Sequence, residues 1–436
     1  MSDHLGIFGR EPGETGELDV EQLRAALGSA PAEPAAGSAE PGPPVDDDQR
    51  PDAARRRHRR WLIFAVVVLL VIVSGLAVGF ILWRGAADVV ADYSGSGDTE
   101  VVIRIQGGDG LEDIAKTLAD AGVVASPEAF QQQAALDADV QALRPGYYKV
   151  RQNASAQATA DALVAKENRV GQFRLVPGRQ LADVTAVSTD PNTPAAVVPG
   201  YISVITAAAC VPLNGRQGCF TTDDLWQVAR TADPAALGVV EWAADGVRAA
   251  PEPSKRLEGV MLPGDFDIPP GSTPEQALKA VISASAALWN GTDIIADSAK
   301  SGISPYQAAI MASLIEREAI AGDMPKVSRV IFNRLAAGMK LEFDSTVNYA
   351  LDRASIATTE QDRANPSPYN TYVQQGLPPT PISSPGPEAV AAALNPAEGS
   401  WLFFVKANAK GESCFSVTAE QHEACVTQAR ANGVFG

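Results

Sequence analysis

The chain has 436 residues, of which 46% are hydrophobic and 20% are charged, and its formal net charge at pH 7 is −17. This length exceeds what one hydrophobic core usually organises, so we expect two or more folded units together with non-globular segments. The negative charge argues against nucleic acid as a partner, because proteins that follow a phosphate backbone normally carry a basic face.

Histidine is too scarce to suggest a metal centre. The three histidines are His4, His58 and His422, and the first two lie in segments that we interpret as non-globular. A histidine-rich zinc site is therefore excluded, and no other pattern in the chain indicates a metal or a cofactor.

The four cysteines fall into two close pairs, Cys210 with Cys219 and Cys414 with Cys425. Neither pair has the CxxC spacing that is typical of metal or redox sites. Two disulfides with short loops are predicted if the compartment is oxidising, and buried reduced thiols are the alternative.

Residues 1–60 are predicted to be a disordered cytoplasmic tail. They combine Pro, Gly, Ala and acidic residues, including Asp46–Asp48, with too few large apolar groups to offset the entropy lost on ordering. The tail ends in a basic cluster at Arg55–Arg60.

Residues 61–83 are predicted to form one transmembrane helix. The run from Trp61 to Trp83 contains no charged residue, and a helix of this length spans the core of a bilayer. A cleaved signal peptide would be shorter and would lie near residue 1. Because five arginines precede the run and Arg84 alone follows it directly, the N-terminus is expected in the cytoplasm and residues 85–436 outside it. The predicted location is the plasma membrane, with a single pass.

A short linker at residues 84–99 is followed by a predicted small domain at residues 100–167. Glu100–Gln106 alternates like a strand, Leu111–Ala121 has helical spacing, and Tyr147–Val150 is expected to close a strand-helix-helix-strand unit. With Gly-Asp-Gly-Leu before the first helix, the unit resembles a LysM-like glycan-binding module. A plain packing or spacer domain is the alternative.

The next segment shows fewer chemical signals. A helix is expected over residues 152–166 and a strand over Phe173–Val176. Residues 188–256 are rich in Ala and Pro and are interpreted as a helical connection, with no motif that indicates a function.

A helix that carries acidic residues begins at Ser304. Ser304 is a typical N-cap residue, Pro305 occupies the first helical position, and Gln307 stands three residues after the cap. The pattern predicts that this helix continues through Ala319.

Glu318 is the candidate acid/base residue on this helix. At 100° per residue, Glu318 shares a face with Leu314 and Ile315, whereas Glu316 points to the opposite side. A carboxyl group on a buried face should have a raised pKa, which suits a general acid. The alternative is a salt bridge of Glu318 with Arg317 or Arg329.

Five separated motifs add a family resemblance. They are Ala312–Glu318, Val330–Leu335, Phe343–Tyr349, Tyr369–Tyr372 and Gly376–Pro379. In order and spacing they resemble the endolytic murein transglycosylases of the YceG-like family. The resemblance extends from about residue 100 to the C-terminus and is strongest between residues 305 and 405.

The resemblance implies that Glu318, the second glutamate of its motif, is catalytic. It implies cleavage between N-acetylmuramic acid and N-acetylglucosamine inside nascent peptidoglycan strands, giving 1,6-anhydro ends and limiting strand elongation. The implied partners are glycan strands, a lipid bilayer contacted by one helix, and cell-wall synthases. One carboxyl group suffices for this reaction, because the C6 hydroxyl of the substrate can attack C1.

Five further residues are predicted to bind substrate or to support the site. Tyr369, Asn370 and Tyr372 lie in a polar loop suited to stacking on sugars and to hydrogen bonding, although they could instead fasten the loop. Asn333 could orient Glu318. Asp344 is expected to position sugar hydroxyls or to brace its loop rather than to act as a nucleophile.

The predicted fold class is α+β, with a single N-terminal transmembrane helix, a small LysM-like domain and a mixed α+β catalytic domain at residues 168–436. Two other functions remain open. One is a catalytically silent scaffold that binds glycan or cell-wall synthases. The other is a muramidase that uses water, which would leave reducing rather than anhydro ends.

Overall fold

The computed structural model describes residues 53–86, 90–186, 194–354 and 358–434. The chain divides into two units, Met1–Ala87 and Asp88–Gly436. The described elements form a mixed α+β fold, as the sequence predicted. Residues 1–52 of the predicted tail lie outside the described residues.

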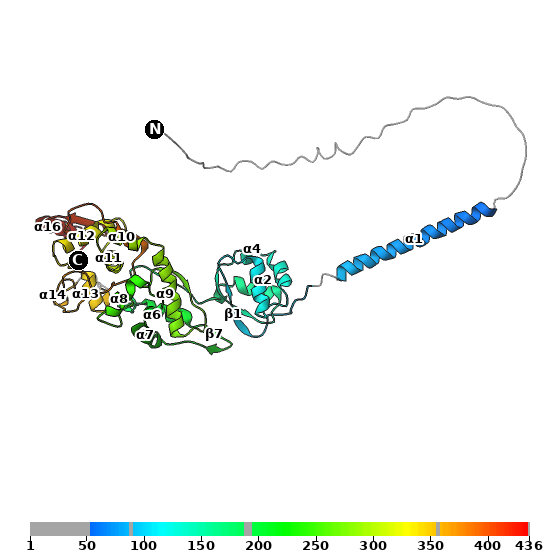
Figure 1. The fold of residues 1–436 in the computed structure, drawn as a ribbon, viewed down its shortest axis with the longest axis horizontal. Helices are drawn as coiled ribbons and strands as arrows, with labels where there is room; N and C mark the ends of the chain where they lie inside the picture. Colours follow the sequence, from blue (N-terminus) through cyan, green and yellow to red (C-terminus); the bar gives the residue numbers. More distant parts are fainter. Residues whose placement is uncertain (1–52, 87–89, 187–193, 355–357, 435–436) are drawn as a thin grey trace, which may run out of the picture. The chain divides into compact units, whose positions relative to one another are not determined.

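The described part of the first unit is one long helix, α1 (Ala53–Ala86), shown in blue in Figure 1. The side chains described along α1, such as Trp61 and Phe64, are exposed. Those of residues 53–60, 62, 63, 79 and 81–86 lie outside the description. Within the residues that are described, no helix is long and apolar enough to cross a membrane.

The second unit opens with a small module built on a three-stranded antiparallel sheet in the order β1-β2-β3. Its elements are β1 (Glu100–Ile105), α2 (Leu111–Asp120), α3 (Pro127–Ala134), α4 (Ala138–Gln141), β2 (Gly146–Arg151), α5 (Ala156–Val164), the 3-10 helix η1 (Lys166–Asn168) and β3 (Arg169–Val170). Leu118, Phe130 and Leu163 from three of the helices pack on one side of the sheet. The predicted strand-helix-helix-strand order is therefore present, with α4 and β3 in addition. The sheet reaches Val170, past the predicted end at residue 167.

The larger body that follows is mainly helical (Figure 1). Its elements are β4 (Gln172–Leu175), β5 (Val184–Ala186), β6 (Ala196–Val198), α6 (Tyr201–Ala209), β7 (Pro212–Leu213), β8 (Arg216–Gln217), α7 (Thr222–Thr231), α8 (Glu241–Ala249), β9 (Gly264–Asp267), α9 (Pro274–Asn290), α10 (Ile294–Lys300), α11 (Pro305–Glu318), α12 (Met324–Ala336), α13 (Asp344–Ala350), β10 (Arg353–Ala354), α14 (Glu360–Arg363), α15 (Pro387–Leu394), β11 (Phe403–Lys406), β12 (Ser413–Ser416) and α16 (Ala419–Ala431). Its short strands pair as β4-β9, β10-β5-β6, β7-β8 and β11-β12.

Two clusters of buried side chains hold this body together. One gathers residues of α6 to α9 with β4 and β9, and the other gathers residues of α10 to α13 and α15. The connection predicted at residues 188–256 thus contributes three helices to the first cluster. Its small hairpin β7-β8 is closed by a disulfide between Cys210 and Cys219.

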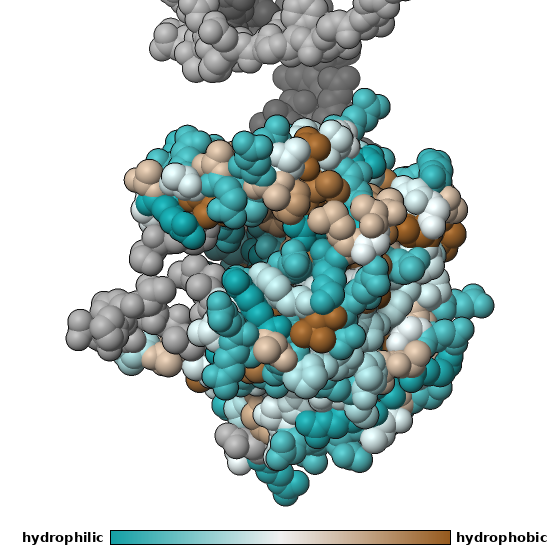
Figure 2. Space-filling model, turned by 90° about the vertical axis from the view of Figure 1, so that its left-hand side faces the viewer, coloured by the Kyte–Doolittle hydropathy of each residue, from teal (hydrophilic) through white to brown (hydrophobic). Residues whose placement is uncertain are grey.

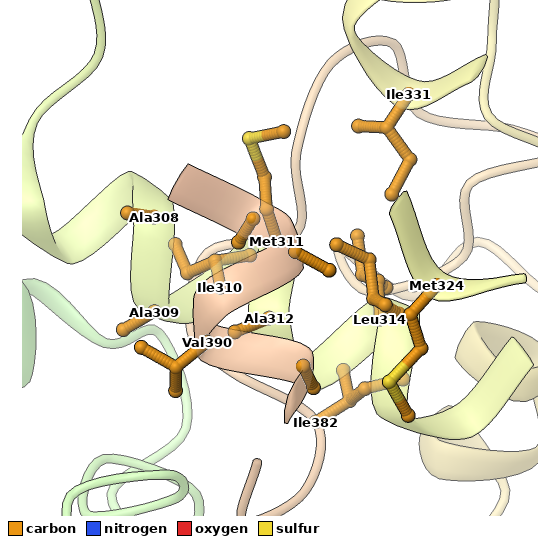
Figure 3. Packing of buried hydrophobic residues seen from close by; sticks show 14 of the residues in the cluster. Ala308, Ala309, Ile310, Met311, Ala312, Leu314, Met324, Ile331, Ile382 and Val390 are labelled. Atoms are coloured by element: carbon orange, nitrogen blue, oxygen red, sulfur yellow. The ribbon is translucent and has the colours of Figure 1, made fainter. Parts of the chain in front are cut away.

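Helix α11 is the central element of the second cluster. Its start follows the predicted signal, because Ser304 Oγ accepts the N–H of Gln307 at 3.1 Å while Gln307 Oε1 accepts the N–H of Ser304 at 2.8 Å. All eight residues from Ala308 to Ile315 are buried. Figure 3 shows Met311 and Leu314 packed among side chains such as Met324 and Val390, which belong to α12 and α15.

The sequence predicted one apolar face for α11, but the structure buries this helix on all sides between Ala308 and Ile315. A helix that is apolar all round belongs in a core. Glu318 follows this buried segment, so the surrounding body fixes the position of its backbone.

The C-terminal part adds a hairpin and a last helix. β11 and β12 are antiparallel, with Phe404 opposite Phe415. A disulfide joins Cys414 of β12 to Cys425 of α16.

Candidate active site

Glu318 is the last residue of α11, and Ala319 caps the helix in an extended conformation. Its side chain is half-buried. Burial raises the pKa of Glu318, and the charge of Asp344 raises it further, whereas Ser345 and Lys406 lower it. A carboxyl group that favours its protonated form can serve as a general acid at neutral pH.

Glu316 lies on the other side of α11 and has a different partner. Its carboxylate accepts the N–H of Gly386 at 2.9 Å, and Gly386 is the N-cap of α15. Glu316 is also half-buried, and burial raises its pKa. Its carboxylate therefore binds a helix terminus, so partners rather than exposure distinguish the two glutamates.

The salt-bridge alternative for Glu318 has little support. Arg317 donates to the carbonyl oxygen of Gly178 at 3.0 Å, and Arg329 donates to that of Ala397 at 2.5 Å. Both guanidinium groups thus hold backbone loops.

Asp344, at the first turn of α13, is the centre of a polar cluster. Its carboxylate accepts hydrogen bonds from Tyr372 Oη at 2.9 Å and from Thr358 Oγ1 at 2.5 Å. Arg363 forms an ion pair with it at 3.2 Å, and the guanidinium lies 4.8 Å from the centre of the Tyr372 ring. Burial raises the pKa of Tyr372, and the charges of Asp344 and Glu318 contribute. The structure therefore brings Glu318, Asp344 and Tyr372 together.

Tyr369 does not reach this site, which corrects its predicted role in binding sugars. The side chain has no exposed surface. It packs edge-on against Tyr349 with 5.0 Å between ring centres, and its hydroxyl accepts a hydrogen bond from Thr380 Oγ1 at 3.2 Å. A ring that is wholly covered by protein cannot stack on a sugar, so Tyr369 fastens its loop instead.

Asn370 needs the same correction. It is fully buried, and its amide donates to the carbonyl oxygens of Arg363 and Asn365 at 2.9 and 2.7 Å. Its side-chain oxygen accepts the N–H of Tyr372 at 3.0 Å. Asn370 therefore shapes the loop that presents Tyr372.

Asn333 on α12 is engaged away from Glu318. Its amide donates to the carbonyl oxygens of Gly399 and Trp401 at 3.2 and 2.9 Å. These contacts tie α12 to the segment before β11. Asn333 was predicted to orient Glu318. In the structure its amide group holds backbone carbonyl groups instead, and this structural role competes with the predicted one.

Two residues near Glu318 were missed by sequence reasoning. Ser345 belongs to the Phe343–Tyr349 motif, so its place in that motif was an available signal. Lys406 ends β11 and is exposed, and nothing local in the sequence relates it to Glu318.

The surface around these elements is mainly hydrophilic. Figure 2 views the end of the second unit that carries α11 to α14 and shows a recess between an upper and a lower part. A pocket of about 360 Å³ lies elsewhere, lined by residues such as Leu288, Asp297 and Val390 and by none of the site residues above. Within the described ranges, no group of three or more His, Cys, Asp or Glu side chains could hold a metal ion.

Comparison with known families gives the context for this site. A model of the YceG-like family matches residues 103–428, which include Glu318 and every other residue of the site. The chain belongs to the YceG-like family. The match starts within β1, so the small module is part of the family architecture.

Two curated relatives of this YceG-like chain are named endolytic murein transglycosylases. The protein of Bacillus subtilis (strain 168) is 34% identical over 169 residues, which are 38% of this chain and 46% of the relative. The protein of Streptococcus pneumoniae (strain ATCC BAA-255 / R6) is 28% identical over 180 residues, which are 40% of this chain and 32% of the relative. The chain therefore matches less than half the length of either relative.

A solved structure is also similar. The crystal structure of a YceG-like protein from Listeria monocytogenes is 23% identical in sequence, with a TM-score of 0.48. The similarity covers 75% of this chain and 98% of that one.

Proposed function

We propose that this YceG-like protein is an endolytic lytic transglycosylase of peptidoglycan, with Glu318 as its single acid/base residue. The observation that carries the proposal is the contrast between two neighbouring carboxyl groups. Burial raises the pKa of Glu318, whereas Asp344 is paired with Arg363 and hydrogen-bonded by Tyr372. The names of the curated relatives support the same activity.

The reaction needs one group that gives and then takes a proton. Glu318 donates its proton to the glycosidic oxygen between N-acetylmuramic acid and N-acetylglucosamine, and the bond from C1 to that oxygen breaks. The C6 hydroxyl oxygen of the muramyl residue attacks C1, and its proton passes to the Glu318 carboxylate. The products are a 1,6-anhydro end and a new free end, and no water is consumed.

Asp344 is poorly suited to act as the nucleophile of a hydrolase. A retaining glycosidase needs a second carboxylate that is free to bond to C1. The oxygens of Asp344 already accept hydrogen bonds from Tyr372, Thr358 and Arg363. We therefore assign Asp344 and Tyr372 to positioning of the substrate and of the surrounding loops.

The remaining parts of the proposal concern location and partners. The uncharged run from Trp61 to Trp83, with the arginines before it, supports a single-pass anchor with its N-terminus in the cytoplasm. The small module is proposed to be LysM-like and to bind glycan. Cell-wall synthases are proposed as neighbours because the products would limit strand elongation.

Product analysis tests the function. The purified full-length protein is incubated with uncrosslinked glycan strands, and the fragments are identified by mass spectrometry. Internal fragments with 1,6-anhydro ends are expected. Reducing ends would indicate a muramidase that uses water, and binding without cleavage would indicate a scaffold.

A further inference from the structure

The last turn of α11 is tied to the rest of the body by two side chains. Glu316 and Arg317 lie in this turn, directly before Glu318. The carboxylate of Glu316 accepts the N–H of Gly386 at 2.9 Å. Nη1 of Arg317 donates to the carbonyl oxygen of Gly178 at 3.0 Å. The end of the helix is therefore bound to two segments that are distant from it and from each other in the chain.

These two segments are also bound to each other. The N–H of Gly178 donates to the carbonyl oxygen of Ser384 at 2.8 Å, and the N–H of Ser384 donates to that of Arg179 at 2.9 Å. The contacts therefore form a closed ring of hydrogen bonds, which joins the last turn of α11 to residues 384–386 and to residues 178–179.

The segment before Gly386 has a second attachment to α11, independent of the ring. One turn earlier in the helix, Ser313 Oγ accepts the N–H of Ile382 at 3.0 Å, and the carbonyl oxygen of Ser313 accepts the hydroxyl of Ser383 at 3.2 Å. Both serines are fully buried. Opening the ring should therefore leave this segment in place and disturb only the end of the helix.

The backbone of both segments lies close to the Glu316 carboxylate. A Cβ atom added at Gly386 would lie 3.1 Å from Glu316 Oε2 and 3.4 Å from Pro177 Cβ. Gly178 has a φ of +73°, in the left-handed region that favours glycine. Two glycines thus allow the close approach of the chain that the ring requires.

The ring acts at the place where α11 is least able to hold its own shape. Glu318 is the last residue of the helix, and the last carbonyl groups of a helix have no partner inside it, so helix ends open most easily. A catalytic group must stay within about 0.5 Å of its productive position. Contacts that fix the last turn therefore bear on proton transfer by Glu318.

We infer that Glu316 and Arg317 are positioning residues, which hold the last turn of α11 and thereby place the Glu318 carboxyl group for proton transfer. This inference rests on the proposed function. Both side chains bind backbone groups of the protein, so they act through Glu318 and not on the substrate.

The first test opens the ring from either side in the full-length protein. Glu316→Ala removes the acceptor and Arg317→Met removes the donor. Each should lower kcat by about 10- to 100-fold, because small displacements of a catalytic group are costly. KM should change little, since the removed contacts do not bind substrate. Glu316→Gln keeps an acceptor oxygen and should keep most of kcat.

Arg329→Met is the matched control for Arg317→Met. Arg329 of α12 also donates to a backbone carbonyl oxygen, that of Ala397, away from the last turn of α11. Its replacement should leave kcat at the wild-type value. An equal loss of kcat in Arg329→Met and Arg317→Met would overturn the inference, because it would indicate general destabilisation.

A double variant tests whether the two side chains act as one unit. Either replacement alone opens the ring, so Glu316→Ala combined with Arg317→Met should lower kcat little further than the more severe single variant. Two independent contacts would instead give losses that multiply, and that result would contradict a ring.

Hydrogen exchange gives a readout that does not depend on activity. The N–H of Ala319 donates to the carbonyl oxygen of Ile315 at 3.0 Å at the end of α11. Peptides that span residues 313–322, followed by mass spectrometry, should exchange faster in Glu316→Ala and Arg317→Met than in the wild type and Glu316→Gln.

Unchanged exchange and unchanged kcat in both ring variants would overturn the inference. Absence of strand cleavage by the wild type would instead reject the proposed function, and the exchange rates would still show whether the ring holds the last turn of α11.

Discussion

At the scale of single residues, Glu318 and Glu316 differ in what they contact. Both are half-buried glutamates at the end of α11, and burial raises the pKa of both. Glu316 accepts the N–H of Gly386, while Ser345 and Lys406 lower the pKa of Glu318. Their isosteric variants should therefore have different effects.

Glu318→Gln should abolish strand cleavage with the fold retained. Gln keeps the shape of Glu but cannot deliver a proton, and acid/base catalysis is typically worth about 10²- to 10⁴-fold in rate. Because one residue does both jobs here, the loss should lie near the upper end of that range. Release of anhydro-muropeptides measures the rate, and circular dichroism checks the fold.

Glu316→Gln is the matched control and should retain substantial activity, because an amide oxygen can still accept the N–H of Gly386. If Glu316→Gln lost all activity and Glu318→Gln did not, the catalytic assignment would move away from Glu318.

A second prediction at the residue scale concerns Glu258 and the pH dependence of folding stability. It is 3% exposed, and burial raises its pKa from an ordinary value of 4.5 to about 8. Its carboxyl group accepts the N–H of Leu181 and the hydroxyl of Tyr349, each at 3.2 Å. These two hydrogen bonds lower the pKa of Glu258, but burial outweighs them, so the protonated form is favoured in the folded state.

Between about pH 5 and pH 8 the folded protein keeps this proton and the unfolded chain does not, so stability should fall as pH rises. The slope approaches about 1.4 kcal/mol per pH unit for one proton. Glu258→Gln cannot titrate and should lack this part of the pH dependence. Denaturant unfolding of both proteins from pH 5 to pH 9 measures it, and parallel curves would contradict the prediction.

At the scale of elements, the C-terminal hairpin depends on α16 and on the disulfide between Cys414 and Cys425. Phe403 of β11 stacks on His422 of α16 with 5.3 Å between ring centres. β11 also carries Lys406, the cation that lowers the pKa of Glu318. The hairpin therefore contributes to the electrostatics of the site.

Replacing Cys414 and Cys425 together by Ala should lower the stability of this part by about 2–4 kcal/mol, as expected for a short disulfide loop. Thermal melting of the wild type and of the double variant measures the loss. Peptide mapping without reductant should find the two native pairs in the wild type. Free thiols at all four positions, or bonds between the two pairs, would contradict the assignment.

At the scale of the whole molecule, the proposal places the second unit outside the cytoplasm. A reporter that is active only outside the cytoplasm should be active when fused after residue 84, because the arginines before Trp61 favour the cytoplasmic side. A fusion before Arg55 is the control and should be inactive. If the second unit were protected from protease in intact spheroplasts, it would lie in the cytoplasm, which is the opposite of the proposed orientation.

Local signals in the sequence determined much of the fold. The start of α11 was predictable because the cap residue Ser304 and its partner Gln307 are three residues apart. The strands β1 and β2 and the helix α2 were predictable from alternation and helical spacing. The family was predictable because its motifs are short and keep their order.

The tertiary structure decided which residues of the site face one another. Tyr369 and Asn370 looked like surface residues because their loop is polar, but Tyr349 and the backbone around Arg363 cover them. Conversely, Ser345 of α13 and Lys406 of β11 influence the pKa of Glu318 although both lie far from it in the chain. Exposure and electrostatic partners are set by elements distant in the chain, and the pattern around a single residue does not contain them.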